Sequence, residues 1–414
     1  MEHKIVFLMF IFVIYSFLGW TIESLRSSIK QKKLVNRGIL NGPFVIVYGL
    51  TAIIITIAFF DTKNIPLIFI GAFIYSSFTE LAAGKILEIF NKGKWWDYSN
   101  RKFNIGGYIC LQSSLLWALL GTLVVLVCNP LLNNFFHLFN YDFLKIFNIS
   151  MLILMVIDFV ISYISLTKDH SSKIVSSKSN KDLSDEVIQR VKNAYPTTRN
   201  NTFNENAFNI YKFMIYMVLG GVIGCACETV FCRYTMNQWM SRSSLIYGEI
   251  SLVWGLALAL FTTFLHMYRK KSNLFLFVCG FVIGTAFEYI CGSFCEFFYG
   301  YSFWDYNHLP LNINGRVQIV FALIWGFAAL IYIKVIYKYA NKVIEKIPER
   351  IGKIIITLVV ALLLIDTAIS IGAGMRFTER QNGLEPSNVF EKFCDKYYTD
   401  EFMTNRFKSL KIME

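Results

Sequence analysis

The chain carries one sequence unit twice, and this duplication restricts its possible folds more than any other feature. Ten residues recur after the same interval of 208 positions, without a gap. The first set is Glu80, Gly84, Glu88, Phe90, Trp96, Asp97, Tyr98, Asn104, Ile105 and Gly107, and the second is Glu288, Gly292, Glu296, Phe298, Trp304, Asp305, Tyr306, Asn312, Ile313 and Gly315. Agreement of this extent at one offset indicates an internal repeat. We therefore expect function to lie in what the two copies share.

Further matches extend the repeat on both sides. Downstream, at 208 positions, Trp117 recurs as Trp325 and Asp158-x3-Ser162 recurs as Asp366-x3-Ser370. Upstream the interval falls to 205, where Glu23 and Arg37 recur as Glu228 and Arg242. A three-residue difference in loop length near the second span, with the longer loop in the second copy, explains the change of interval.

The composition is that of a multi-pass membrane protein. Apolar residues make up 55% of the 414 residues and charged residues only 16%, whereas a soluble domain averages about 25% charged residues. The net charge of +12 fits basic cytoplasmic loops that meet anionic lipid, so the expected partner is the lipid bilayer. Nucleic acid is excluded as a partner, because no basic face alternates with stacking aromatic residues on a soluble module.

The apolar runs predict an all-α membrane protein with about ten transmembrane helices, five in each copy. The predicted spans lie near residues 5–26, 43–60, 65–90, 108–128 and 144–167, and near residues 209–232, 246–268, 273–299, 316–338 and 351–373. This gives a first five-helix repeat over 1–167, a hydrophilic linker over 168–208, a second repeat over 209–373 and a C-terminal tail over 374–414. The balanced charges and scattered apolar residues of the tail predict an ordered cap or short helix.

The distribution of Lys and Arg predicts the orientation. Basic residues gather in alternate loops, including the loop with Lys92, Lys94, Arg101 and Lys102, and in the linker. By the positive-inside rule, the linker is cytoplasmic and both termini lie outside. Two copies of five spans joined in series must cross in opposite directions, so we expect inverted-topology repeats, an architecture of many transporters.

Four carboxylates fall deep inside predicted spans: Glu80, Asp158, Glu288 and Asp366. An ionised acid at such a depth costs about 2.5–3.5 kcal/mol, so it needs a partner, a proton or a water-filled path. The structural alternative is a hydrogen bond between helices. The functional alternative is a site for a cation, a proton or a polar substrate, which we favour.

The spacing of these acids suggests which residues accompany them. Glu88 and Glu296 follow Glu80 and Glu288 on the same helix faces, and Ser162 and Ser370 follow the two aspartates in the same way. We expect these faces to meet, bringing Glu80 near Asp158 and Glu288 near Asp366. Two carboxylates so placed would share a proton or a cation.

Two further sets favour structural roles. Glu23 and Glu228 end their spans, where Arg37 and Arg242 can form ion pairs with them. The loop residues are expected to anchor fixed loop structure at the membrane surface. They are Trp96, Asp97, Tyr98 and Asn104 in the first copy and Trp304, Asp305, Tyr306 and Asn312 in the second.

Several kinds of chemistry are missing from the sequence. It has no Gly-x4-Gly-Lys-[Ser/Thr] phosphate-binding loop, so the chain does not bind ATP in that manner. Neither hydrolase motifs nor a zinc-ligand set of Cys and His is present. We expect no metal, no cofactor and no catalytic residue.

The repeated strings resemble a bacterial membrane family of ABC-transporter permeases, the type IV or CmpB-like family. The matching strings are Gly19-Trp20-x2-Glu23, Asn36-Arg37-Gly38-x2-Asn41-Gly42-Pro43, Tyr48-Gly49, Trp95-Trp96-Asp97-Tyr98-Ser99, Asn104-Ile105-x-Gly107-Tyr108-x-Cys110-Leu111 and, in the tail, Arg376-x2-Glu379-Arg380. The resemblance implies a permease subunit whose ATPase is a separate chain.

The sequence therefore favours an integral membrane permease that moves a small solute or ion past intramembrane carboxylates. One alternative is a membrane enzyme that acts on a lipid-linked substrate, with the carboxylates as acid and base. The other is a structural or regulatory membrane scaffold.

Overall fold

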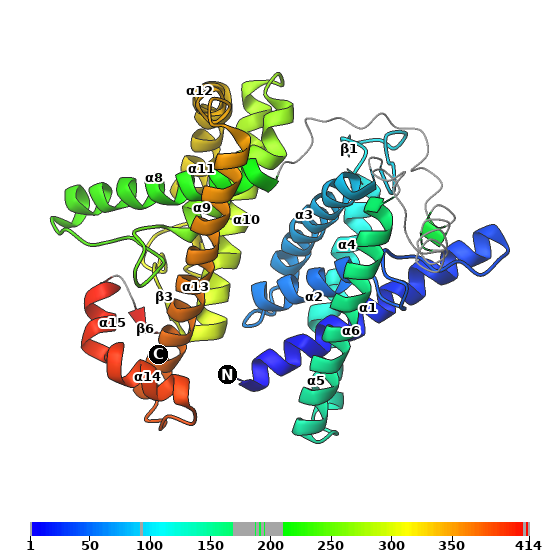
Figure 1. Ribbon diagram of the computed structural model, residues 1–414, viewed down its shortest axis with the longest axis horizontal. Helices are drawn as coiled ribbons and strands as arrows, with labels where there is room; N and C mark the ends of the chain where they lie inside the picture. The colour runs from blue at the N-terminus through cyan, green and yellow to red at the C-terminus, as the bar shows by residue number, and fades with distance from the viewer. Residues whose placement is uncertain are drawn as a thin grey trace. The chain divides into compact units, whose positions relative to one another are not determined.

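A computed structural model describes residues 2–91, 94–168, 187, 190, 191, 194, 210–408 and 411–412. The chain divides into two compact units, Met1–Phe208 and Asn209–Glu414. Most of the predicted linker, over 168–208, lies outside the described residues. The described part is largely helical (Figure 1).

The first unit is built from long helices and one small hairpin. Its helices are α1 (Glu2–Gln31), α2 (Ile46–Ala58), α3 (Ile65–Asn91), α4 (Leu111–Leu123), the π-helix η1 (Val124–Cys128), α5 (Asn129–Phe136) and α6 (Tyr141–Lys168). The strands β1 (Asn104–Ile105) and β2 (Ile109–Cys110) pair antiparallel between α3 and α4, with Asn104 opposite Cys110.

The second unit repeats this order of elements. It contains α8 (Ile210–Met236), α9 (Leu252–Leu265), the 3-10 turn η3 (His266–Tyr268), α10 (Asn273–Tyr299), β3 (Tyr301–Ser302), β4 (Asn312–Ile313), β5 (Val317–Gln318), α11 (Ile319–Ile331), the π-helix η4 (Tyr332–Ile336), α12 (Tyr337–Ile344) and α13 (Glu349–Gln381). The hairpin of β4 and β5 sets Asn312 opposite Gln318, as β1 and β2 do for the equivalent residues. Most of these bounds lie 208 positions after those of the first unit, so the repeat in sequence is also a repeat in structure.

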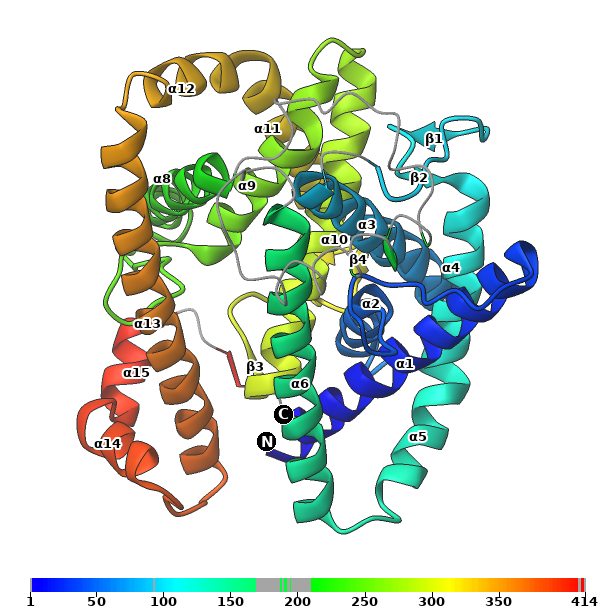
Figure 2. The same ribbon diagram turned by 45° about the vertical axis from the view of Figure 1, so that its right-hand side comes forward.

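Both units contain a π-helix at the same place in their fourth long helix. In the first unit, α4, η1 and α5 follow one another as a continuous helix (Figure 2). In the second, α11, η4 and α12 do the same. Such wider turns are rare and usually occur as single insertions within an α-helix.

Eight helices among the described residues are long and apolar enough to cross a membrane. They are α1, α3, α4 continued through α5, α6, α8, α10, α11 continued through α12, and α13. Many of their apolar side chains are exposed, including Ile146, Ile153 and Leu154 on α6. Such faces suit a lipid environment, since monomeric soluble proteins rarely expose apolar patches of this size.

The prediction of ten spans of about 20 residues is not met at the second position of either unit. There α2 has 13 residues and α9 has 14, so at 1.5 Å per residue each covers only about 20 Å of the ~30 Å hydrocarbon core. The residues before them are rich in Gly, Pro and Ser, which favour turns over helix. We call these stretches the lead-in segments, residues 33–45 in the first unit and 237–251 in the second.

The first lead-in segment is non-helical and runs antiparallel to α1. The backbone N–H groups of Val35 and Arg37 donate to Ser28 Oγ at 2.9 Å and Ser24 Oγ at 3.0 Å. Further along, Val45 N–H donates to the carbonyl of Ser16 at 2.9 Å. The same direction continues in α2, since Ala52 packs against Ile11 and Tyr15 of α1.

Close packing of the first two helices of each unit depends on glycine. A Cβ atom at Gly49 of α2 would lie 2.3 Å from Ser16 Oγ and 2.6 Å from the Phe12 carbonyl. A Cβ atom at Gly255 of α9 would lie 2.5 Å from the Met217 carbonyl of α8. Glycine at these positions lets the two backbones approach as they do in membrane helix pairs.

The C-terminal tail is ordered and packs on the second unit, as the sequence predicted. It forms α14 (Val389–Tyr397) and α15 (Asp400–Arg406), which lie beside the end of α13 (Figures 1 and 2). Cys394, Tyr398 and Met403 are buried there against Tyr301 and Phe377. The strand β6 (Lys411–Ile412) pairs antiparallel with β3.

Candidate functional site: a carboxylate pocket in each unit

The two intramembrane aspartates hold the lead-in segments. Asp158 on α6 accepts hydrogen bonds from the N–H groups of Asn41 at 3.1 Å and Gly42 at 2.7 Å, and from Asn41 Nδ2 at 2.8 Å. Ser162, one turn further along α6, donates to the same carboxylate at 3.4 Å. Asp158 thus satisfies backbone groups that no helix or sheet would satisfy.

Asp366 on α13 does the same in the second unit. Its carboxylate accepts from the N–H groups of Tyr247 at 3.3 Å and Gly248 at 2.8 Å. Ser370 Oγ accepts from the N–H of Ile246 at 2.9 Å. The aspartates therefore cap non-helical backbone in both units, and Ser370 does so in the second.

The expected meeting of Glu80 with Asp158, and of Glu288 with Asp366, does not occur among the described contacts. Each aspartate is occupied by a lead-in segment, while each glutamate bonds to loop and helix residues elsewhere in its unit. The physical reason is that backbone N–H groups in the lead-in segments compete for the aspartates. The four acids form two separate kinds of site.

Glu80 and Glu288 are buried and receive hydrogen bonds from neutral donors. Glu288 is 7% exposed, and it accepts from the Tyr306 hydroxyl at 3.1 Å and from Trp325 Nε1 at 2.9 Å. Glu80 is 6% exposed, and it accepts from the hydroxyls of Tyr98 and Ser113 at 3.1 Å.

A second glutamate lies in each neighbourhood and is paired with arginine. Glu228 accepts from Arg242 Nε at 3.0 Å and from Trp254 Nε1 at 2.8 Å. In the first unit, Arg37 Nε lies 3.5 Å from Glu23, which also accepts from the Tyr48 hydroxyl at 3.0 Å. These are the arginine–glutamate pairs that the sequence suggested.

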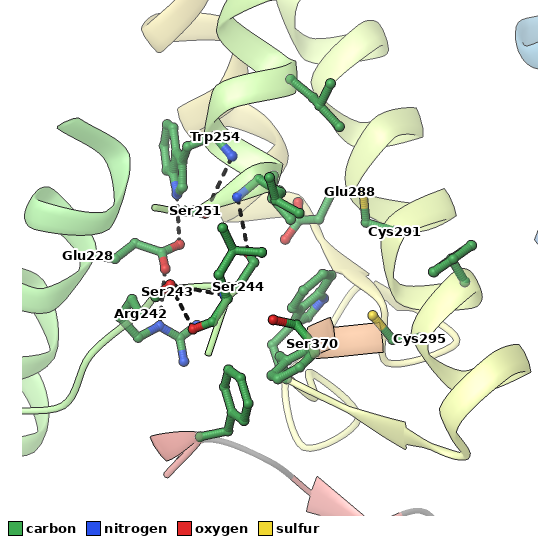
Figure 3. Close-up of a pocket in the computed structure, with 18 of the residues that line it drawn as sticks. Glu228, Arg242, Ser243, Ser244, Ser251, Trp254, Glu288, Cys291, Cys295 and Ser370 are labelled. Atoms are coloured by element: carbon green, nitrogen blue, oxygen red, sulfur yellow. Dashed lines mark hydrogen bonds and ion pairs between the residues drawn. The ribbon is translucent and has the colours of Figure 1, made fainter. Parts of the chain in front are cut away.

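The two glutamates of each unit line one cavity. In the second unit the cavity has a volume of about 490 Å³, and Glu228 and Glu288 approach it from different helices (Figure 3). In the first unit the equivalent cavity has a volume of about 300 Å³ and is lined by Glu23 and Glu80. Ligand pockets typically have volumes of about 300–1,000 Å³, so both are large enough to hold a small molecule.

Aromatic side chains form much of the wall of each cavity. Trp254 and Trp325 line the second, with ring centroids 4.8 Å apart. Tyr48 and Trp117 are the equivalent pair in the first, with centroids 4.7 Å apart. The loop residues also contribute: Trp96 and Tyr98 line the first cavity and Trp304 and Tyr306 line the second.

The Trp-Asp-Tyr loop of the first unit has a fixed internal structure that positions Tyr98. Trp96 Nε1 donates to the carbonyl of Tyr108 at 2.7 Å, and Asp97 accepts from the N–H of Ser99 at 2.9 Å. Asn104 Oδ1 accepts from the N–H of Gly107 at 3.1 Å. The sequence predicted this anchoring, but not that Tyr98 would reach Glu80.

The second unit reproduces the loop contact by contact. Trp304 Nε1 donates to the carbonyl of Arg316 at 2.8 Å, and Asp305 accepts from the N–H of Asn307 at 2.9 Å. Asn312 Oδ1 accepts from the N–H of Gly315 at 3.0 Å. Tyr306 lies outside the helices, and burial together with the nearby Glu288 carboxylate raises its pKa, so it remains a hydrogen-bond donor.

The third repeated acid has different partners in the two units. Glu88 accepts a hydrogen bond from the Tyr108 hydroxyl, and Lys85 is buried on the same helix one turn away. Glu296 forms an ion pair with Arg316, which stands where the first unit has Tyr108. The positive charge beside this acid is thus on the helix in the first unit and in the loop in the second. Neither Glu88 nor Glu296 lines the cavities.

In each unit, an arginine that comes after the last long helix in the sequence donates to carbonyl groups of the lead-in segment. Arg190 donates to the carbonyls of Gly38 at 3.0 Å and Ile39 at 2.9 Å. Arg406 of α15 donates to the carbonyls of Leu245 at 2.7 Å and Gly248 at 3.1 Å, and to Glu249 at 2.6 Å. We call these two residues the clamp arginines.

Several of these residues were missed in the sequence. Tyr48 stood out only as part of a family string and Trp254 not at all, because the residue types differ between the copies, although each donates to the equivalent glutamate. The recurrence of Trp117 as Trp325 was a usable signal. No sequence signal pointed to the clamp arginines, since the linker and tail share no string. Among the described residues, no group of three or more His, Cys, Asp or Glu could hold a metal ion.

The comparison with known families decides the membership of the chain. A family described as "Putative ABC-transporter type IV" matches residues 10–163 and 213–371, which together are most of the chain. The chain belongs to this family. No curated protein and no solved structure matches it. This CmpB-like chain is therefore a transporter-type protein of the membrane, and each matched segment falls within one structural unit.

Proposed function

We propose that this protein is a membrane permease that moves a small solute or ion, and that Glu80 and Glu288 line its path. The observation that carries the proposal is the environment of Glu288. It is a buried carboxylate in a cavity, held by Tyr306 and Trp325, both neutral donors. A buried acid without a cationic partner binds a proton or a cation, because the bare charge is costly there.

The equivalent acid in the first unit supports the same proposal. Glu80 is as buried as Glu288, and it faces a cavity with an arginine–glutamate pair at the side. A purely structural hydrogen bond would not require an open volume beside each acid. A buried acid beside a cavity in each copy suits a transporter whose two halves exchange conformations.

We propose further that each lead-in segment and the short helix after it together complete one crossing. The first lead-in segment follows α1 from Ser28 to Ser16, and α2 continues in the same direction to Ile11. Non-helical backbone is tolerated within a membrane where protein buries it, and Asp158 and Asp366 supply its hydrogen-bond partners. Each unit then has five crossings, which supports inverted repeats with both termini on one side. The distribution of Lys and Arg favours a cytoplasmic linker and termini outside.

The family points to a separate ATPase as partner. The sequence has no phosphate-binding loop of its own, so a separate chain would supply the energy. The subunit alone would then exchange solute down a gradient.

Flux through proteoliposomes that contain the purified full chain tests the proposal. The probes are protons, followed with a trapped pH dye, and labelled rubidium and methylammonium. We expect at least one flux above that of empty liposomes, and Glu80→Gln and Glu288→Gln should each reduce it at least tenfold. Glu345→Gln, at an exposed ion pair with Lys212, is the control. If both glutamine variants fold and carry the flux at the unsubstituted rate, the path does not include these acids.

A further inference from the structure

We infer that the larger cavity, in the second unit, is a binding site for a small organic cation that carries apolar groups. This inference rests on the proposed function and names the class of its solute. It depends on three properties of the cavity: an acid that lacks a cation, aromatic walls and a difference in charge from its counterpart.

The acids of this cavity favour a positive ligand. Arg242 is already engaged with Glu228 through a contact of 3.0 Å. Glu288 is held by Tyr306 and Trp325 and faces the same volume (Figure 3). One carboxylate is therefore left to neutralise a ligand, and a cation that enters would regain there the charge partner it loses on leaving water.

The walls suit the apolar part of such a ligand. Trp254, Trp304, Trp325 and Tyr306 line the cavity beside the two acids. Aromatic faces attract ammonium and guanidinium groups, and recognition of quaternary ammonium groups uses such walls. A cavity of about 490 Å³ holds a molecule larger than an inorganic ion, and the many apolar and aromatic residues of its lining favour an organic one.

The first unit provides an internal comparison. Its cavity of about 300 Å³ is also lined by Arg26 and Lys30, in addition to Arg37. At the 205-residue interval, Arg26 and Lys30 correspond to Phe231 and Thr235, so the second unit lacks these two positive charges. The smaller cavity should repel a cation that the larger one attracts.

Equilibrium binding of labelled benzyltrimethylammonium to the purified full chain tests the inference. Its neutral isostere, neopentylbenzene, has the same shape without the charge. We expect saturable binding of the cation, and binding of the isostere at least tenfold weaker. Glu288→Gln should weaken cation binding at least tenfold, because it removes the charge and keeps the shape. Glu288→Asp should restore part of it.

Glu345→Gln is the matched control, since it makes the same change at an exposed ion pair with Lys212, outside the cavity. Cation binding should be unaffected by it. Equal binding of cation and isostere, equal effects of the two glutamine variants, or preference for the anionic analogue benzenesulfonate would overturn the inference. These outcomes leave the permease proposal intact if flux still depends on Glu80 and Glu288. Loss of that dependence with cation binding retained would overturn the permease proposal alone.

Discussion

Asp366 accepts a hydrogen bond of 2.8 Å from the backbone N–H of Gly248, a residue 118 positions earlier in the chain. Asp158 and Gly42 stand in the same relationship in the first unit, at 2.7 Å. In each unit an acid of the last long helix thus holds the backbone just before the short second helix. The aspartates bind the lead-in segments, while Glu80 and Glu288 face the cavities.

Replacement of Asp366 should destabilise the protein more than replacement of its neighbour. Asp366→Ala leaves the N–H groups of Tyr247 and Gly248 without their acceptor, which costs about 2–4 kcal/mol. Thr367→Ala is the control, since that hydroxyl bonds within its own helix, to the Leu363 carbonyl. Thermal unfolding in detergent, followed by fluorescence, measures both. An equal effect of the two variants would contradict the assigned role of Asp366.

Arg316 and Glu296 should contribute to the stability of the fold only when both charges are present. Arg316 is 1% exposed, so Arg316→Leu leaves a nearly buried carboxylate uncompensated and should cost about 3–5 kcal/mol. The double variant Arg316→Leu with Glu296→Gln should be more stable than the single variant, because it removes the unpaired charge. Thermal unfolding of the two single variants and the double variant gives the coupling. Additive effects of the two substitutions on stability would contradict the predicted coupling.

The clamp arginine Arg406 should protect the second lead-in segment from local opening. Its guanidinium occupies the carbonyls of Leu245 and Gly248. Arg406→Ala should speed hydrogen exchange at residues 243–250 about tenfold for each 1.4 kcal/mol of protection lost. Lys408→Ala, an exposed basic residue nearby, is the control and should leave exchange unchanged. Unchanged exchange in Arg406→Ala would show that the clamp is not needed.

Docking of the tail should weaken in acid. Hydrogen bonds from Arg376 and Arg380 hold the pKa of Asp395 below its usual range, despite opposing desolvation. A group with a lowered folded pKa adds stability above its unfolded pKa, about 3.9, and loses it as the pH falls through the folded value. Hydrogen exchange at residues 389–406, corrected for the intrinsic rate, should therefore stay constant down to about pH 4 and rise below it. Asp395→Asn should be fast throughout; an unchanged acid profile in that variant would contradict this account.

The proposed inversion of the two units can be read from labelling. Ser99 and Asn307 are exposed at equivalent positions of the two Trp-Asp-Tyr loops. With an impermeant maleimide, Asn307→Cys should react in intact cells and Ser99→Cys only after the cells are opened. The unsubstituted protein, which has its own free cysteines, gives the blank. Reaction of both from the same side would refute the inversion.

The sequence predicted the order of elements and most of the candidate residues because duplication marks both. Glu80 and Glu288, which recur at a fixed interval, keep equivalent hydrogen bonds with Tyr98 and Tyr306. The length of the second helix was overestimated because apolar residues continue a few positions beyond its ends, and hydropathy does not separate helical from non-helical backbone. The pairing of Glu80 with Asp158 was wrong because a shared helix face does not say which backbone group reaches a carboxylate first.

Divergence between the copies hid the rest. Tyr48 and Trp254 are different residue types that make the same hydrogen bond, so no string search joins them. Arg190 and Arg406 lie in segments without common sequence, yet both reach carbonyls of the lead-in segments. These residues are equivalent in their three-dimensional positions and contacts but not in their sequence.

The π-helices η1 and η4 begin at Val124 and Tyr332, 208 positions apart. A turn of this type holds more residues than an ordinary helical turn, and it is too rare to have arisen twice at one site by chance. The widening is therefore older than the gene doubling, and the ancestral single-unit protein already had it. Any descendant of that ancestor that never doubled should carry the same wide turn after its Asn-Ile-x-Gly loop.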